Sequence, residues 1–177
     1  MRTRVGYAGG TTENPTYHNL GDHSETIQIE YDPAQISYEE LLDVFWSSHD
    51  PSTPAWSRQY MSIIFYHDEA QRSLALKTRD RQAAALDREI VTEIVPAGEF
   101  YLAEDYHQKY RLQQTPALMA EFEAIYPDEA DFVASTAAAR VNGYLGGNGT
   151  CEGLRAESGE LGLSPEGVQR LVSRVCR

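Results

Sequence analysis

The first hundred residues contain several short segments whose pattern is typical of β-strands. Residues 27–31 alternate strictly between apolar and polar side chains, which indicates a strand with one buried face. Residues 61–66 and 90–95 are runs of β-branched and aromatic residues, and Pro96 ends the second run. The chain also opens on a strand-like segment that ends at the Gly9–Gly10 turn. The pattern therefore predicts four strands.

Helical spacing and capping residues predict helices between these strands. Ser37 and Glu40 have the spacing of a capping box, and apolar residues follow at helical intervals. We expect this helix to end near His49, because the next residues lead into a proline. Asp68 can cap a second, longer helix that runs to about Leu86. Strands joined by helices in this way indicate an α+β fold.

From about residue 104 onward the pattern is mainly helical. Helical segments are expected over residues 104–110, 117–126 and 131–141, and from Ser164-Pro165 to Cys176. The glycine-rich residues 144–149 are expected to form a flexible loop. We therefore predict two domains. Residues 1–110 would form an α+β core, a mixed β-sheet sandwich flanked by helices, and residues 111–177 a helical extension that packs on it.

Composition and charge exclude several classes of function. The 177 residues are 41% hydrophobic and 24% charged, which is typical of a soluble globular protein. A net charge of −12 repels nucleic acid and anionic membranes, so neither is expected as a partner. Apolar runs of only a few residues predict no membrane span and no signal peptide, hence a cytoplasmic protein. The five histidines show no metal-ligand spacing, so no metal site is expected.

Four polar or aromatic residues lie in or beside the loops that flank the predicted strands. They are Tyr17, Glu25, Trp56 and Tyr60. Polar groups at the ends of neighbouring strands can converge on one pocket. The alternative is a set of edge aromatics and a surface carboxylate with no common role.

Two cysteines are too few for a disulfide framework. Cys151 follows the glycine-rich loop and Cys176 is the penultimate residue, and such flexible positions suit a thiol that must move to react. The alternatives are that both are inert cytosolic thiols, or that they pair as a thiol switch.

Seven motifs keep an order and spacing that resemble the peptide methionine sulfoxide reductase A family. They are residues 3–10, 14–17, 23–25, 31–33, 44–46 with 49–51, 58–60 and 100–107. The resemblance covers about residues 2–110, and the tail, with residues 139–144, resembles a divergent branch with an extended helical C-terminus. It implies a ferredoxin-like core and the reduction of methionine S-sulfoxide, in proteins or free, to methionine. This reaction is a repair of oxidative damage.

The resemblance also implies roles for the residues named above. Glu25 matches the acid that protonates the sulfoxide oxygen, and Tyr17 and Tyr60 match two tyrosines that hydrogen-bond it. Trp56 follows Ala55, which stands where the family usually has an aspartate, and would narrow the pocket.

The implied chemistry is that of thiols and needs no cofactor. Attack of a cysteine on the sulfoxide leaves a sulfenic acid, which a second thiol resolves to a disulfide. Cys151 and Cys176 are the candidate resolving thiols. The resemblance implies thioredoxin or another dithiol as the reductant, and we expect a monomer.

The sequence departs from the family at the nucleophile. The Gly-Cys-Phe-Trp motif belongs just upstream of Thr3, and neither cysteine matches its position. One explanation is that Met1 is an internal methionine, so that the core lacks its first strand and helix. The other is that the chain is complete and is a non-catalytic binding module for a sulfoxide or a protein partner. For this chain as it stands, we predict little or no reductase activity.

Overall fold

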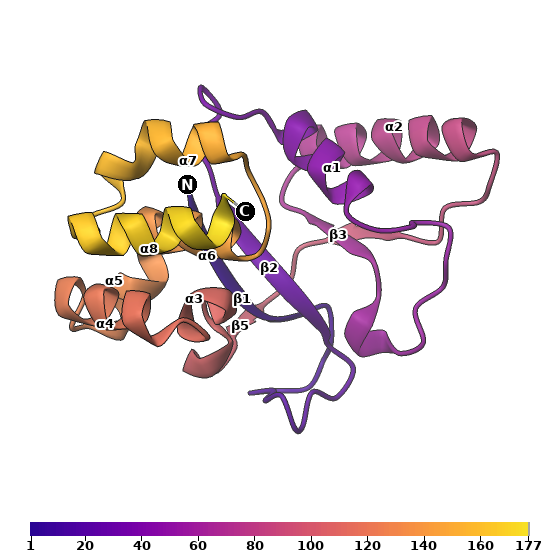
Figure 1. The fold of residues 1–177 in the computed structure, drawn as a ribbon. Helices are drawn as coiled ribbons and strands as arrows, with labels where there is room; N and C mark the ends of the chain where they lie inside the picture. Colours follow the sequence, from indigo (N-terminus) through magenta and orange to yellow (C-terminus); the bar gives the residue numbers. More distant parts are fainter. Residues whose placement is uncertain (177) are drawn as a thin grey trace. The chain divides into compact units, whose positions relative to one another are not determined.

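The computed structural model describes residues 1–176 and contains both helices and strands (Figure 1). The strands are β1 (Arg2–Ala8), β2 (Ser24–Glu30), β3 (Ile63–Tyr66), β4 (Glu93–Pro96) and β5 (Phe100–Leu102). β1 lies between β2 and β5 in one sheet, and β3 pairs with β4 in another. β1 and β5 are antiparallel, with Tyr7 opposite Tyr101, whereas β3 and β4 are parallel, with Ile64 opposite Ile94. The predicted α+β class is confirmed.

Eight helices and three single-turn 3-10 segments make up the rest of the regular structure that the described residues form. The helices are α1 (Tyr38–Ser47), α2 (Glu69–Leu86), α3 (Tyr110–Gln113), α4 (Pro116–Ile125), α5 (Glu129–Ala134), α6 (Thr136–Leu145), α7 (Cys151–Glu157) and α8 (Pro165–Val175). The 3-10 segments are η1 (Arg58–Tyr60), η2 (Asp105–His107) and η3 (Ser158–Glu160). None of the helices in the described part of the chain is both long and apolar enough to cross a membrane.

The chain forms two compact units. The first, called the site unit below, comprises Gly6–Thr26 and Tyr31–Leu102. The second, called the helical unit, comprises Met1–Val5, Ile27–Glu30 and the chain from Ala103 onward. The predicted domain boundary near residue 110 remains a prediction.

In the site unit, α1 and α2 lie side by side over β3 (Figure 1). Both helices begin where the sequence predicts. Ser37 and Glu40 form the capping box of α1, and the Asp68 side chain accepts a hydrogen bond from the Gln71 backbone at the start of α2. These local hydrogen bonds set where the helices begin, and therefore which of their faces turns toward the sheet.

A small apolar core joins these two helices to β3. Its buried members are Leu42, Trp46, Ile64 and Ala75. The Trp46 indole N–H donates to the Thr78 hydroxyl at 2.9 Å, so the polar edge of the ring is satisfied inside the core.

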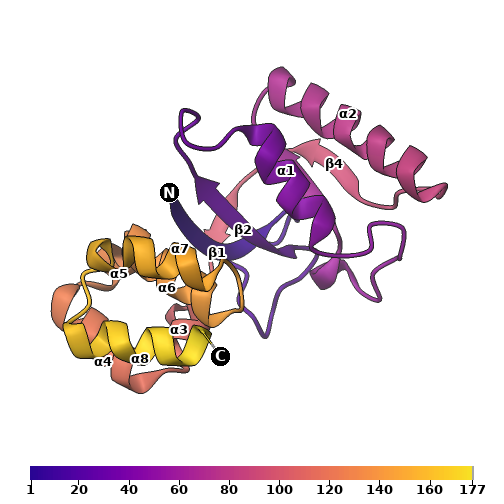
Figure 2. The same ribbon diagram turned by 45° about the horizontal axis from the view of Figure 1, so that its top comes forward.

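The core of the helical unit is contributed by α3 to α8 and the segments between them. Its buried members are Leu112, Leu118, Phe122, Phe132, Val133, Ala138, Val141, Leu154, Leu161 and Leu171. Figure 2 shows α8 beside α4 and α6. The predicted cap of α8 is confirmed, since the Ser164 hydroxyl accepts from the Gly167 backbone at 3.0 Å. Glu121 of α4 in turn accepts from the Ser164 backbone at 2.7 Å and joins α4 to the start of α8.

Two adjacent side chains, Gln108 and Lys109, bind the start of β1 to the rest of the helical unit. Gln108 donates to the carbonyl oxygens of Val5 and Ala103 and accepts from the Val5 backbone N–H. The Lys109 ammonium is buried and donates to the Thr3 carbonyl and hydroxyl. Burial lowers the pKa of Lys109 to about 8.

Several predicted boundaries in the helical unit are wrong. Residues 131–141 are not one helix, because the Ser135 side chain accepts from the Ala138 backbone and caps a new helix, α6. The expected loop over residues 144–149 begins late, since α6 continues to Leu145. The sequence also did not predict α7 in this unit, or β5 in the site unit. Ser135 and Thr150 cap α6 and α7, and β5 pairs with β1, so local caps and a tertiary contact decide these three elements.

Candidate active site

Glu25, the predicted acid, contacts the segment that carries Tyr60. Its Oε1 accepts a hydrogen bond from Gln59 Nε2 at 2.7 Å. The preceding residue, Ser24, is buried, and its hydroxyl donates to the Arg58 carbonyl oxygen at 2.6 Å. The first two residues of β2 therefore bind two consecutive residues of η1, in which Tyr60 is the last residue.

Tyr60 lies within electrostatic reach of Glu25 and hydrogen-bonds to Tyr17. Partial removal from water raises the pKa of Tyr60, and the negative charge of Glu25 raises it further. A phenol with a raised pKa keeps its proton at neutral pH and stays a hydrogen-bond donor. The structure thus brings together the three predicted oxygen-binding residues.

The ring of Trp56 lies against the ring of the same tyrosine. The rings of Trp56 and Tyr60 have centroids 4.9 Å apart and planes inclined by 37°. Trp56 is 82% exposed and Tyr60 42% exposed, so both present aromatic surface to solvent. An exposed aromatic face beside hydroxyl donors can contact a small apolar group attached to a polar one. The predicted role of Trp56 in narrowing a pocket stays a prediction.

The loop that carries Tyr17 is closed at its ends by Asp22 and His23. The Asp22 carboxylate accepts from the backbone N–H groups of Thr11, at 2.8 Å, and Thr12, at 3.2 Å. The His23 ring accepts at Nδ1 from the Gly10 N–H at 3.1 Å and, as the Nε2–H tautomer, donates to the Thr12 carbonyl at 2.8 Å. Hydrogen bonds from the Thr11 backbone are the main cause that holds the pKa of Asp22 well below its usual range.

Gly10 is required where this loop closes. A Cβ at Gly10 would lie 2.6 Å from the Asp22 carboxylate and 2.7 Å from the His23 backbone nitrogen. Both distances are shorter than van der Waals contact, so only glycine lets the two strand ends approach this closely.

Arg58 connects η1 to two further elements of the site unit. Its guanidinium donates to the Glu93 carboxylate of β4 at 2.8 Å and to the Gly9 carbonyl at 3.5 Å. No sequence pattern predicted a role for Arg58, Gln59 or Ser24. The family motif at residues 58–60 contains two of them, but their partners are distant in sequence and no local pattern indicates the contacts.

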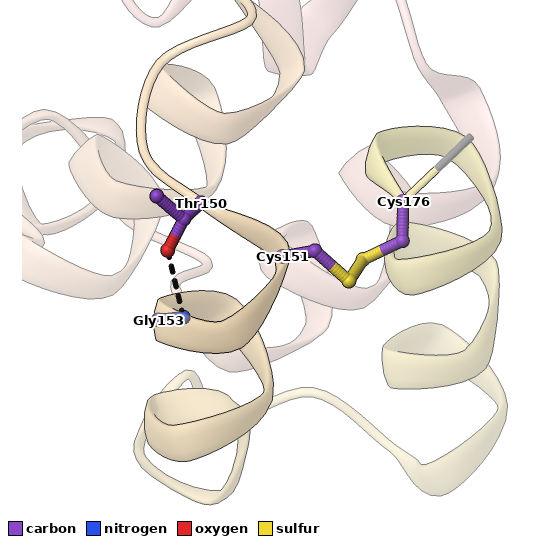
Figure 3. The surroundings of a disulfide bond; sticks show 4 residues. All are labelled: Thr150, Cys151, Gly153 and Cys176. Atoms are coloured by element: carbon purple, nitrogen blue, oxygen red, sulfur yellow. Dashed lines mark hydrogen bonds between the residues drawn. A yellow bond between two sulfur atoms is a disulfide. The ribbon is translucent and has the colours of Figure 1, made fainter.

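The two cysteines form a disulfide in the helical unit, with Cα atoms 5.2 Å apart (Figure 3). The expectation of flexible thiols is wrong, since Cys151 is the first residue of α7 and Cys176 follows α8. The Thr150 hydroxyl accepts from the Gly153 backbone at 3.0 Å and caps α7 (Figure 3). Pairing of the two sulfurs was one alternative from the sequence. The resolving role of either cysteine stays a prediction.

The site unit therefore offers a carboxyl group, two phenols and an indole face on one surface. Such a set can donate hydrogen bonds and a proton to a polar oxygen. Among the described residues, no three His, Cys, Asp or Glu side chains are grouped so that they could hold a metal ion.

Comparison with known proteins relates the chain to one family. A family model described as peptide methionine sulfoxide reductase matches residues 1–140. A peptide methionine sulfoxide reductase of Drosophila melanogaster is 44% identical over 93% of this chain and 67% of its own length. Peptide methionine sulfoxide reductase A5 of Oryza sativa subsp. japonica is 43% identical over 81% of this chain and 58% of its own length.

Solved structures give the same relation. Mxr1 from Saccharomyces cerevisiae in reduced form has a TM-score of 0.60 and 32% identity, over 64% of this chain and 71% of that one. Methionine sulfoxide reductase A of Corynebacterium diphtheriae has a TM-score of 0.54 and 35% identity, over 64% of this chain and 63% of that one. The chain spans 58% and 67% of the length of the rice and fly relatives. It belongs to the peptide methionine sulfoxide reductase family.

Proposed function

We propose that this protein acts in the reduction of methionine S-sulfoxide to methionine, with its site unit binding the sulfoxide and protonating its oxygen. The observation that carries the proposal is the meeting of Glu25, Tyr60 and Tyr17 on one surface. A sulfoxide is a strong hydrogen-bond acceptor with a methyl group beside it. The two phenols suit the oxygen, and the exposed ring of Trp56 suits the methyl group.

The proposed reaction transfers two electrons from thiol sulfur to sulfoxide sulfur. A cysteine thiolate attacks the sulfoxide sulfur while the Glu25 carboxyl gives its proton to the oxygen. Methionine leaves and the cysteine becomes a sulfenic acid. A second thiol then displaces the hydroxyl group as water and forms a disulfide, which a dithiol reduces. The site unit itself contains no cysteine, so the thiolate comes from outside it.

The remaining parts of the proposal concern partners and place. We propose thioredoxin or another dithiol as the reductant, and Cys151 and Cys176, when reduced, as the candidate resolving thiols. We also propose that the chain acts as a monomer in the cytoplasm and repairs proteins oxidised under stress. The net charge of −12 supports a protein substrate or a small molecule rather than nucleic acid.

Binding measurements test the site without requiring turnover. N-acetyl-methionine (S)-sulfoxide methylamide is titrated by calorimetry between about pH 7 and about pH 4, where a carboxyl group titrates. We expect affinity to rise on acidification, because the protonated Glu25 carboxyl donates to the sulfoxide oxygen. Glu25→Gln keeps a neutral donor at this position and should remove the pH dependence. The thioether analogue without the oxygen should bind about tenfold more weakly.

Two results would contradict the proposal. One is equal affinity for the sulfoxide and the thioether, and the other is an unchanged pH dependence in Glu25→Gln. Turnover with dithiothreitol is measured in parallel. Rapid reduction by this chain alone would contradict the prediction that it has little or no reductase activity as it stands.

A further inference from the structure

We propose that Gln59 is a positioning residue that fixes the Glu25 carboxyl group so that Oε2 carries and delivers the proton. This inference rests on the proposed function, since it concerns the acid of that reaction. It begins with the 2.7 Å hydrogen bond from Gln59 Nε2 to Glu25 Oε1. A carboxylate has no hydrogen to donate, so the amide nitrogen of Gln59 is the donor.

The hydrogen bond assigns different roles to the two carboxyl oxygens. Oε1 accepts from Gln59 whether Glu25 is ionised or neutral. When Glu25 is protonated, its hydrogen therefore lies on Oε2. As Oε2–H gives its proton to the sulfoxide oxygen, the carboxyl group becomes a carboxylate, and the Gln59 N–H stabilises the new charge. Gln59 thus favours the state that forms during proton transfer.

The position of η1 does not depend on this hydrogen bond. The Ser24 hydroxyl holds the Arg58 carbonyl, and the Arg58 guanidinium binds Glu93 and the Gly9 carbonyl. These contacts tie η1 to β2, β4 and the end of β1. The additional bond from Gln59 is therefore available to orient Glu25, and its loss should leave the turn and Tyr60 in place.

The test compares Gln59→Leu with the wild-type chain. Leucine has a similar size and lacks the donor. The first readout needs no ligand: the side-chain carbonyl carbon of Glu25 is followed by NMR as the pH is lowered. We expect the midpoint of this NMR signal to move to higher pH in Gln59→Leu, because the carboxylate loses the hydrogen bond from the Gln59 amide. Gln35→Leu, at an exposed glutamine of the same unit, is the control and should not move it.

The second readout shows whether Gln59 acts through Glu25. Affinity for N-acetyl-methionine (S)-sulfoxide methylamide is measured against pH for Gln59→Leu alone and combined with Glu25→Gln. We expect the single variant to shift the pH dependence of binding. In the Glu25→Gln background, Gln59→Leu should change affinity by less than about twofold, because no carboxyl group remains to be oriented.

Each outcome supports or overturns the inference. An unmoved NMR midpoint in Gln59→Leu would overturn it, as would an equal loss of affinity in both backgrounds, which would show that Gln59 only supports the turn. A moved midpoint in a chain that does not bind the sulfoxide would support the orientation of Glu25 by Gln59. That result would overturn the proton delivery and the proposed function instead.

Discussion

Tyr60 and Tyr17 share a hydrogen bond, although one ends a 3-10 turn and the other lies in the loop before β2. The bond makes the two phenols one donor system, because Tyr60 can donate to Tyr17 while Tyr17 donates to a ligand. Ionised Glu25 lies within electrostatic reach of Tyr60, and its negative charge would repel the partly negative oxygen of a sulfoxide. In the proposed reaction, the phenols would therefore bind the sulfoxide oxygen better while Glu25 is neutral.

Removal of either hydroxyl should weaken sulfoxide binding. We expect Tyr60→Phe and Tyr17→Phe each to lower affinity by about 2- to 10-fold, the usual net contribution of one hydrogen bond. The double variant should lose less than the product of the two single losses, because the hydroxyls act through a shared bond. Calorimetry on the three variants measures this. Strictly multiplicative losses would show that the tyrosines act independently.

Trp56 should contribute to binding but little to folding. Since its side chain is 82% exposed, Trp56→Ala should change the free energy of unfolding by less than about 0.5 kcal/mol. Loss of an aromatic contact with the ligand should lower sulfoxide affinity by about 2- to 10-fold. Trp56→Phe keeps an aromatic ring and serves as the matched control. Undiminished affinity in Trp56→Ala would exclude the indole from the binding surface.

The disulfide should stabilise the helical unit. Cys151 and Cys176 are separated by 25 positions, and closure of a loop of this size is worth roughly 3 kcal/mol in the chain-entropy description. Addition of a reductant should therefore lower the urea midpoint of the helical circular dichroism signal. The variant with both Cys151→Ser and Cys176→Ser should unfold at this lower midpoint with or without the reductant. A midpoint that reductant leaves unchanged in the wild type would argue against the pairing.

Titration of Lys109 should make the free energy of unfolding change with pH in the alkaline range. Its pKa is about 8 in the folded chain and 10.5 as the ordinary value, so the unfolded chain binds the proton more tightly. Below about pH 8 both states carry the proton, and the folded state bears the cost of a buried charge. Stability from this group therefore rises as the pH increases from about 8 to about 10.5, by at most about 3 kcal/mol.

The comparison variant for this effect is Lys109→Met, which keeps the length of the side chain without the amine. Urea unfolding of both proteins across this pH range gives the difference in their unfolding free energies. We expect the unfolding free energy of the wild type to rise relative to that of the variant as the pH increases. A constant difference would mean that the Lys109 amine titrates alike in both states.

The elements that the sequence predicts well are those set by neighbouring residues. Three helices begin at caps whose hydrogen bonds span only three positions, so these caps can be recognised from the sequence alone. The capping residues are Ser37 together with Glu40 for α1, Asp68 for α2 and Ser164 for α8. The break at Ser135 is of the same kind, but the alanine-rich helical pattern runs through it and hides it.

The parts that could not be predicted depend on contacts between distant residues. Helix α7 follows a glycine-rich segment, and pairing of Cys151 with Cys176 requires α7 to lie beside α8. In the site, the resemblance indicates Glu25 and Tyr60, whereas the contact of Gln59 with Glu25 exists only because η1 folds onto β2. Hydrophobic periodicity carries no information on such polar pairs.

The hydrogen bonds of Asp22 and His23 allow the loop that carries Tyr17 to change in length without moving β2. Because Gly10, Thr11 and Thr12 are hydrogen-bonded to Asp22 and His23, directly before β2, the ends of the loop are fixed independently of its interior. Insertions or deletions between Asn14 and Leu20 would alter the loop around Tyr17 and leave Glu25 on β2 in register. Such length changes offer an evolutionary route, and an engineering one, to a different surface around Tyr17 without rebuilding the strands that carry it.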